Sequence, residues 1–289
     1  MKEEWLASQE TVKQTSPSNT DVAASQRLYS SLQARQEIGT VPADDFGTER
    51  DFESETAMNK ACRLDAAIYE LCLTHQRDLR GLDFIVTGSL PIPYFGDLER
   101  YLSSPLRVVT AALNPSNAEF PRDKPRFDVA MGLRGPAELE TQLSAYFATN
   151  PYRAWFSTFE PVLNGLGASY GGHMAIEMYD STALHLDMCS PIATSPTWSK
   201  LTPDQRGKLT QTGRQVFERL LDELKPHVVV ASFGWAHLEA WDVFSKGRSW
   251  ERMVEHQTAI GGTRLRTPLV VQIGKLAAPN GREIPFINA

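Results

Sequence analysis

The sequence is poor in cysteine and contains no long apolar run. Its 289 residues include three cysteines, at positions 62, 72 and 189, and no Cys-x-x-Cys pair. Neither a disulfide framework nor a cysteine-ligated metal cluster is therefore expected. No run of 18 apolar residues exists, and the opening MKEEWLASQE lacks the apolar core of a signal peptide. These absences predict a cytoplasmic protein with no membrane span.

Phosphate-binding glycine motifs are also absent. Neither G-x-G-x-x-G nor G-x-x-x-x-G-K-[ST] occurs, so a nucleotide-phosphate site on a glycine-rich loop is disfavoured. The sequence does have an apolar fraction of 42%, which supports a sizeable core. The chain is therefore long and apolar enough for one large domain or two small ones.

The net charge of −6 argues at first against nucleic acid, but the charge is unevenly distributed. Residues 1–60 hold six Lys/Arg against eleven Asp/Glu, which leaves a net charge of only −1 for the rest. Short basic stretches lie in that remainder: RDKPR at 122–126, KGRSWER at 246–252 and RLR at 264–266. An acidic enzyme can hold a local basic groove, although each stretch also fits a solvated loop.

The hydrophobic pattern divides the chain into a polar arm, residues 1–55 with a short helix near 22–35, and a single domain, residues 56–289. Within the domain, helical patterns alternate with apolar strands. This alternation predicts a three-layer α/β/α sandwich with a mostly parallel central sheet of about four strands. The expected helices span 56–80, 97–104, 136–148, 151–166, 203–225 and 234–244, and the expected strands span 106–113, 183–189, 227–234 and 268–276.

Two of these strands end in polar residues. The strand at 106–113 runs into Asn114-Pro115-Ser116, and the strand at 183–189 contains Asp187 near its end. Ligand sites of parallel sheets lie beyond the carboxyl ends of the strands, so these side chains are candidates for a site. Asn-Pro-Ser after a strand is also an ordinary turn sequence.

The order of these features resembles the uracil-DNA glycosylase superfamily over about residues 88–289. In that family a strand ends in Gly-x-Asn-Pro-Gly or Gly-x-Asp-Pro-Tyr, and here Ala112–Ser116 occupy the motif. The resemblance implies that Asn114 positions the water that attacks the deoxyribose. It also implies an aromatic that stacks on the extruded base thirteen residues later, at Phe127, with Phe120 as the competing aromatic.

The same resemblance assigns further residues. A Pro-rich loop that contacts the DNA backbone corresponds to Pro91, Pro93 and Tyr94, and the base-reading position at the second strand end corresponds to Asp187. His185 shares a strand face with Asp187 and either enters the pocket or is a buried core histidine. The remaining candidates are Glu119 as a general base, Arg122, Lys124 and Arg126 as phosphate contacts, and Ser116 as a base-binding residue.

The sequence departs from the family at its last motif, in which a His or Asn precedes Pro-Ser. No histidine follows His256, and Asn280-Gly281 between apolar runs predicts a hairpin turn. Lys275 and Arg282 are the candidates to approach the leaving base or the phosphates. The resemblance implies DNA as partner, as a duplex with an extruded base or as a single strand. It implies no cofactor, no metal and no obligatory protein partner.

Two substitutions bear on which base is removed. Uracil-specific relatives have Tyr where this chain has Ser116, and Asn where it has Asp187. An ionised carboxylate only accepts hydrogen bonds, which suits the N4 amino group of cytosine. Room beside C5 then predicts a hydroxymethyl or glucosylated cytosine of phage DNA, and hence anti-phage defence. The alternatives are a uracil or damaged-base repair glycosylase, a non-catalytic reader of modified DNA, and a nucleoside hydrolase or transferase.

Overall fold

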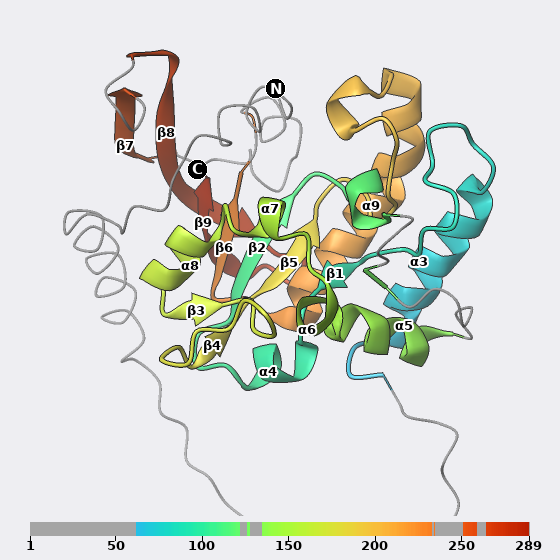
Figure 1. The fold of residues 1–289 in the computed structure, drawn as a ribbon, viewed down its shortest axis with the longest axis horizontal. Helices are drawn as coiled ribbons and strands as arrows, with labels where there is room; N and C mark the ends of the chain where they lie inside the picture. The colour runs from blue at the N-terminus through green and yellow to red at the C-terminus, as the bar shows by residue number, and fades with distance from the viewer. Residues whose placement is uncertain are drawn as a thin grey trace, which may run out of the picture.

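A seven-stranded sheet forms the centre of the protein, with strand order β1-β5-β2-β6-β9-β8-β7 (Figure 1). The computed structural model describes residues 62–121, 126–127, 135–232, 234, 251–258 and 264–288. The expected arm at 1–55, the expected helix at 234–244, and Arg122 and Lys124 lie outside the described residues. Among these residues, no helix has both the length and the apolar character that a membrane crossing requires.

Four neighbouring strands of the sheet run parallel. They are β5 (Leu184–Asp187), β2 (Val108–Ala112), β6 (Val228–Ala231) and β9 (Glu283–Asn288). The short β1 (Tyr94–Phe95) is antiparallel to β5 at one edge. At the other edge, β8 (Arg264–Ala277) and β7 (Glu251–Thr258) are antiparallel, and their hairpin extends away from the other strands (Figure 1). The chain is thus mixed α/β with a mostly parallel sheet at its centre.

The apolar run at 268–276 does not form the last parallel strand that the pattern suggested. It belongs to β8, which is antiparallel to β9. The predicted turn at Asn280-Gly281 is confirmed, and Gly281 adopts a φ of 84°, which glycine reaches without a steric penalty. Because this turn reverses the chain, the short IPFIN segment after it supplies the fourth parallel strand instead.

The helices flank the sheet on both sides, with α8 and α9 to either side of the central strands in Figure 1. Helix α9 packs on β5, and α3 packs on α9 and α5. Short strands β3 and β4 form a separate pair. The helices and these strands are α3 (Ala66–Leu79), α4 (Leu98–Ser103), α5 (Pro136–Ser144), α6 (Tyr146–Thr149), α7 (Arg153–Phe156), α8 (Glu160–Gly165), α9 (Pro203–Leu224), β3 (Ala168–Ser169) and β4 (Ser181–Thr182), with 3₁₀ turns η1 (Asn117–Glu119) and η3 (Trp198–Lys200).

Local sequence signals set several helix ends. Thr202 and Gln205 form a capping box at the start of α9, with both reciprocal hydrogen bonds present. Helix α3 starts later than the expected 56–80, because the Asp65 side chain caps it by accepting from the amide of Ala67. The expected helix at 136–148 is divided into α5 and α6, and the expected helix at 151–166 into α7 and α8.

One glycine determines how closely α9 approaches the sheet. A Cβ on Gly213 would lie 2.0 Å from the carbonyl oxygen of Cys189 and 2.7 Å from the Cα of Ser190. Only a residue without a side chain fits this contact. Gly213 therefore lets the helix rest directly on the loop that follows β5.

Candidate functional site

The loops that follow β2 and β5 are joined by backbone hydrogen bonds. The amide of Met188 donates to the carbonyl of Ala112 (2.8 Å), and the amide of Cys189 donates to that of Leu113 (2.8 Å). In the sheet, Ala112 is the register partner of Asp187. The structure therefore brings the two predicted strand ends together, with Asn114 two residues beyond Ala112.

The side chain of Asn114 is 8% exposed and is held through its nitrogen. Its Nδ2 donates to the Pro115 carbonyl (2.7 Å) and to Thr194 Oγ1 (2.9 Å). Within the described parts of the chain, no group donates to its Oδ1. The amide is thus fixed in one orientation, with its carbonyl oxygen available as an acceptor.

Thr194 is a site residue that sequence reasoning missed. It forms a β-bridge to Ser116, donates its amide to the carbonyl of Pro115 (3.2 Å) and accepts at its own carbonyl from Asn117 (3.2 Å). No local pattern marks this threonine, because its partners lie about eighty residues away in the chain. Ser116 is buried and starts the η1 turn beside it.

A chain of buried polar groups connects Tyr170 to Asp187. The Tyr170 hydroxyl lies 2.6 Å from Thr110 Oγ1, which lies 2.8 Å from Nδ1 of His185. The other ring nitrogen, Nε2, lies 3.9 Å from Oδ1 of Asp187. Burial raises the pKa of Tyr170 well above its usual range, so the phenol stays protonated. His185 is therefore both a hydrogen-bonded core histidine and the neighbour of Asp187.

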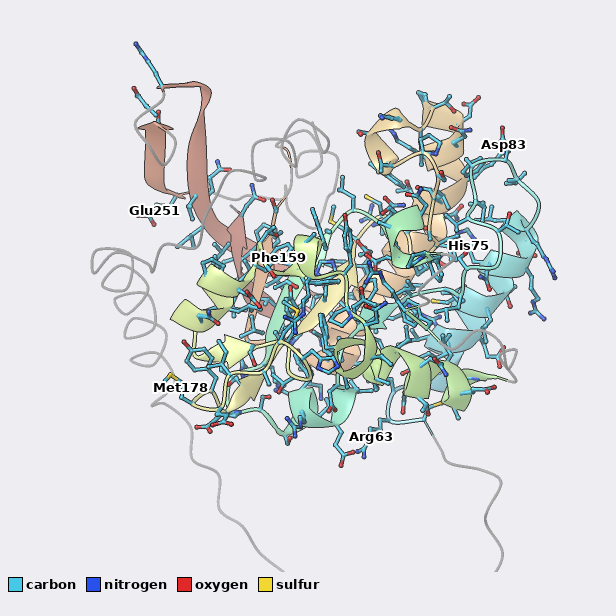
Figure 2. All side chains as sticks on the ribbon, viewed as in Figure 1. Arg63, His75, Asp83, Phe159, Met178 and Glu251 are labelled. Atoms are coloured by element: carbon cyan, nitrogen blue, oxygen red, sulfur yellow. The ribbon has the colours of Figure 1, made fainter. Side chains whose placement is uncertain are left out.

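Aromatic rings surround this chain. The rings of Phe156 and Phe159 lie 5.1 and 5.6 Å from that of His185, and Figure 2 shows Phe159 beside the central strands. The predicted stacking residue Phe127 is buried, and Phe120 stacks on it with centroids 5.6 Å apart. Phe120 is only partly buried, so its ring is the more accessible of the two.

Glu119 and Arg126 stabilise the loop after β2. Tyr146 donates to Glu119 Oε2 (2.5 Å), and burial together with this carboxylate raises the pKa of Tyr146. Arg126 donates to the carbonyls of Ala118 (3.0 Å) and Asn150 (2.8 Å). Its guanidinium is therefore engaged within the protein, which corrects the expectation that it contacts phosphates. The engaged carboxylate likewise gives Glu119 a structural role.

The predicted Pro-rich contact loop lies inside the protein. Pro91, Pro93 and Tyr94 are all buried, and the Tyr94 hydroxyl lies 3.3 Å from that of Tyr69. The amide of Ile92 donates to the carbonyl of Pro191 (2.7 Å), which fastens this loop to the loop after β5. The structure thus corrects these three assignments, because the residues pack in the core instead of facing a ligand.

Lys275 and Arg282 do not reach the strand ends. Lys275 pairs with the carboxylate of Glu283, at the start of β9. Arg282 donates to the carbonyls of Pro226 (2.7 Å) and Leu221 (3.3 Å), at the end of α9. Both therefore lie toward the amino ends of the parallel strands, opposite Asn114, and neither takes the role of the missing last motif.

The segment Gly167-Ala-Ser169-Tyr-Gly171 has the G-x-S-x-G spacing of serine hydrolases. Such a nucleophile requires a sharp turn from a strand into a helix. Here Ser169 is buried in β3, its Oγ accepts from the amide of Gly171 (3.4 Å), and a turn follows instead of a helix. The spacing is therefore not accompanied by the geometry of a serine nucleophile.

Comparisons with protein-family models, curated proteins and solved structures found no match.

Proposed function

We propose that the protein is a monofunctional DNA glycosylase of the uracil-DNA glycosylase type, which hydrolyses the N-glycosidic bond of a C5-modified cytosine. The observation that carries the proposal is the Asn114 amide, held through its nitrogen with Oδ1 free to accept. In the proposed reaction Oδ1 accepts a hydrogen bond from water, whose oxygen attacks C1′ of the deoxyribose. The N-glycosidic bond breaks and its electron pair leaves with the base, the proton of the attacking water passes to the departing base or to solvent, and an abasic site remains.

The chemistry of base removal explains why such a site suits the reaction. The sugar becomes cationic in the transition state while the base becomes anionic, so an uncharged amide orients water without adding a charge. The target base must first leave the helical stack and enter a pocket. The partly exposed Phe120, supported by Phe127, offers a stacking surface that contributes roughly 1–3 kcal/mol.

The base preference in this proposal rests on Asp187 and Ser116. Asp187 lies at the end of β5, next to the end of β2, and as a carboxylate it accepts from the N4 amino group of cytosine. The small Ser116 leaves space beside C5. An enzyme that requires a hydroxymethyl or glucosyl group there removes bases from modified phage DNA and spares host cytosine, which fits a defence role.

Excision assays on matched substrates test the proposal. Duplexes that differ only in one base (cytosine, uracil, hydroxymethylcytosine or its glucosylated form) are incubated with the protein and assayed for alkali-labile abasic sites. Asn114→Ala should lower excision at least about 10²-fold, as expected for a lost catalytic group. Asn117→Ala, an exposed control three residues away, should stay close to wild type.

The substrate series also distinguishes the alternatives. Excision of uracil alone would support a repair glycosylase, and tight binding of modified DNA without excision would support a reader. Release of free base from nucleosides, with none from DNA, would support a nucleoside hydrolase. If the Asn114→Ala variant cleaves within about threefold of wild type, Asn114 does not have a catalytic role.

A further inference from the structure

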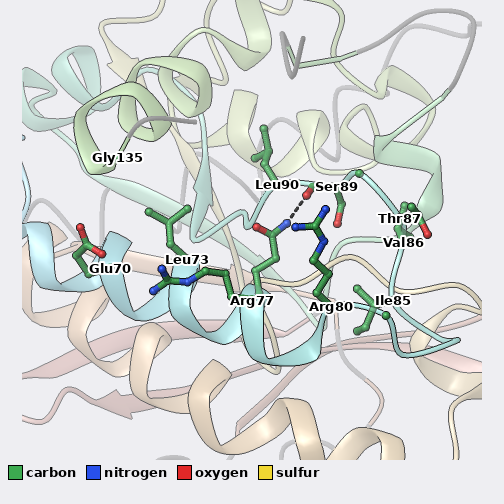
Figure 3. A pocket seen from close by; sticks show the side chains of 13 residues that line it. Glu70, Leu73, Arg77, Arg80, Ile85, Val86, Thr87, Ser89, Leu90 and Gly135 are labelled. Carbon is green, nitrogen blue, oxygen red and sulfur yellow. Dashed lines mark hydrogen bonds between the residues drawn. The ribbon is translucent and has the colours of Figure 1, made fainter. Parts of the chain in front are cut away.

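A cavity of about 690 Å³ lies between the second half of α3 and the loop at 81–90 (Figure 3). We call it the α3 groove. Its lining combines apolar, hydroxyl and cationic side chains: Glu70, Leu73, Gln76, Arg77, Arg80, Gly81, Ile85, Val86, Thr87, Gly88, Ser89, Leu90 and Gly135. The Gln76 amide donates to the carbonyl of Ser89 and fastens the loop to the helix. None of these residues has a role in the site described above.

The α3 groove carries two uncompensated cations. Arg80 rises from the helix toward Ser89, and Arg77 extends along the helix beneath Leu73 (Figure 3). Both are exposed, and neither forms an ion pair with a carboxylate in the part of the chain that the structure describes. Arg77 donates to the hydroxyl of Thr74 (2.9 Å). Their exposure and their lack of a carboxylate partner among the described residues distinguish Arg77 and Arg80 from Arg126 and Arg282, whose guanidinium groups donate to carbonyls within the protein.

Acidic residues near the groove do not cancel this charge. Among the described residues that line it, Glu70 is the one acidic residue. Asp78 and Asp83 lie close by in sequence but do not line it, and Figure 2 shows Asp83 at the outer end of the loop. The described lining residues therefore present two positive charges and one negative charge beside apolar side chains that include Leu73 and Leu90.

The groove adjoins the candidate site through one residue. Thr194, which accepts from the Asn114 amide, forms β-bridges to Ile85 on one side and to Ser116 on the other. The amide of Val86 also donates to the carbonyl of Ala193 (3.1 Å). Since neighbouring strands lie ~4.8 Å apart, the rim of the groove is about 10 Å from Ser116. A ligand in the site and a ligand in the groove can therefore belong to one extended molecule.

We propose that the α3 groove binds a single nucleic-acid strand that continues from the candidate site. Arg77 and Arg80 contact its phosphates, and the apolar side chains of Leu73 and Leu90 contact the faces of unstacked bases or sugars. A single strand fits better than a duplex, because a duplex hides its base faces in the stack. This inference rests on the proposed function, since it extends the path of the DNA away from Asn114.

Binding measurements test the groove independently of catalysis. A fluorescent, unmodified single-stranded oligonucleotide of about 12 residues, within the usual site size, is titrated at several salt concentrations. Arg77→Gln/Arg80→Gln should weaken binding about tenfold at low salt. Losing two phosphate contacts should also reduce the slope of log K against log[salt] by about 1.4. The control Arg219→Gln/Lys225→Gln removes the same charge from exposed positions at the far end of α9 and should bind like wild type.

The outcomes distinguish the groove from the proposed function. An unchanged salt slope in Arg77→Gln/Arg80→Gln, or an equal loss in the control, would overturn the groove even if excision is observed. The groove stands and the proposed function fails if binding depends on Arg77 and Arg80 while no substrate loses a base. A larger effect of the groove variant on a duplex of the same sequence, or no binding of the strand by wild type, would also overturn the inference.

Discussion

Substitution by alanine should have opposite effects on stability at Gly213 and at Gly207, two positions of the same helix. Both lie in α9, and replacement of a helical glycine by alanine normally stabilises a helix by about 1 kcal/mol. Apart from its own stretch of helix, a Cβ on Gly207 would have no atom of the described residues within 4 Å. A Cβ on Gly213 would lie 2.0 Å from the Cys189 oxygen and 2.4 Å from its carbonyl carbon. Only Gly213 therefore sets a steric limit.

The geometry determines which effect dominates at Gly213. Ordinary contact begins at 3.4 Å, so α9 and the loop after β5 must separate by roughly 1.4 Å to admit the methyl group. The obstacle is a backbone carbonyl, which cannot rotate away as a side chain can. Overpacking typically lowers the free energy of unfolding by about 1–3 kcal/mol, and we expect Gly213→Ala to lie at the upper end of this range. After the gain in helix propensity, Gly213→Ala should lose about 2 kcal/mol, whereas Gly207→Ala should gain about 1 kcal/mol.

Urea denaturation of the three proteins measures the difference directly. We expect the two variants to differ by about 3 kcal/mol in free energy of unfolding, with unchanged m-values. Because Asp187 lies just before the displaced loop, Gly213→Ala should also impair the candidate site, and Gly207→Ala should not. Equal stability of the two variants would refute the close approach of α9 to Cys189.

Two further predictions concern histidines. Burial, followed by the charges of Arg107 and Arg282, lowers the pKa of His227. As the pH falls through the ordinary histidine pKa, the unfolded chain therefore binds more protons than the folded protein. The free energy of unfolding should then decrease. His227→Gln should therefore lose less free energy of unfolding than wild type between pH 7.5 and 5.5, and equal losses would contradict this. In the Tyr170–Thr110–His185 chain, Thr110 should donate to Nδ1 and leave the ring proton on Nε2 facing Asp187. ¹⁵N NMR should show that Thr110→Val abolishes this tautomer preference and Thr110→Ser retains it, whereas an Nδ1–H tautomer in wild type would reverse the assignment.

Much of the sheet could be predicted from sequence because its central strands are short and almost wholly apolar. Val228–Ala231 and Val108–Ala112 are buried along their whole length, which is the pattern of strands covered on both faces. The α9 capping box and the Asn280-Gly281 turn are local sequence signals, and the structure contains both. The antiparallel direction of β8 could not be read in the same way, because an apolar run gives no direction without its turn.

The candidate site was less predictable because its side chains depend on distant partners. That Asn114 and Asp187 lie at the carboxyl ends of parallel strands followed from the alternation of helices and strands, whereas the adjacency of those two strands did not. The orientation of Tyr94 could not be predicted from the sequence, because its burial depends on Tyr69 in a separate helix. Arg282 is similar, because the carbonyls at the end of α9 that bind it are about sixty residues away in the chain. A basic side chain in a loop is thus a weak signal for phosphate binding until its partners are known.

The surroundings of Asn114 explain why an amide occupies this position. Its Nδ2 donates to the Pro115 carbonyl, a group that can only accept. An ionised aspartate would place an oxygen against that carbonyl, and the two acceptors would repel each other. The same hydrogen bonds fasten the loop after β2 to Thr194, and through it to Ile85 at the rim of the α3 groove. Under the proposed function, Asn114 would therefore have two separable roles, since its nitrogen joins the two loops and its oxygen would accept from the attacking water. A substitution that keeps the nitrogen bonded and removes the acceptor would leave the loops joined and abolish only the proposed chemistry.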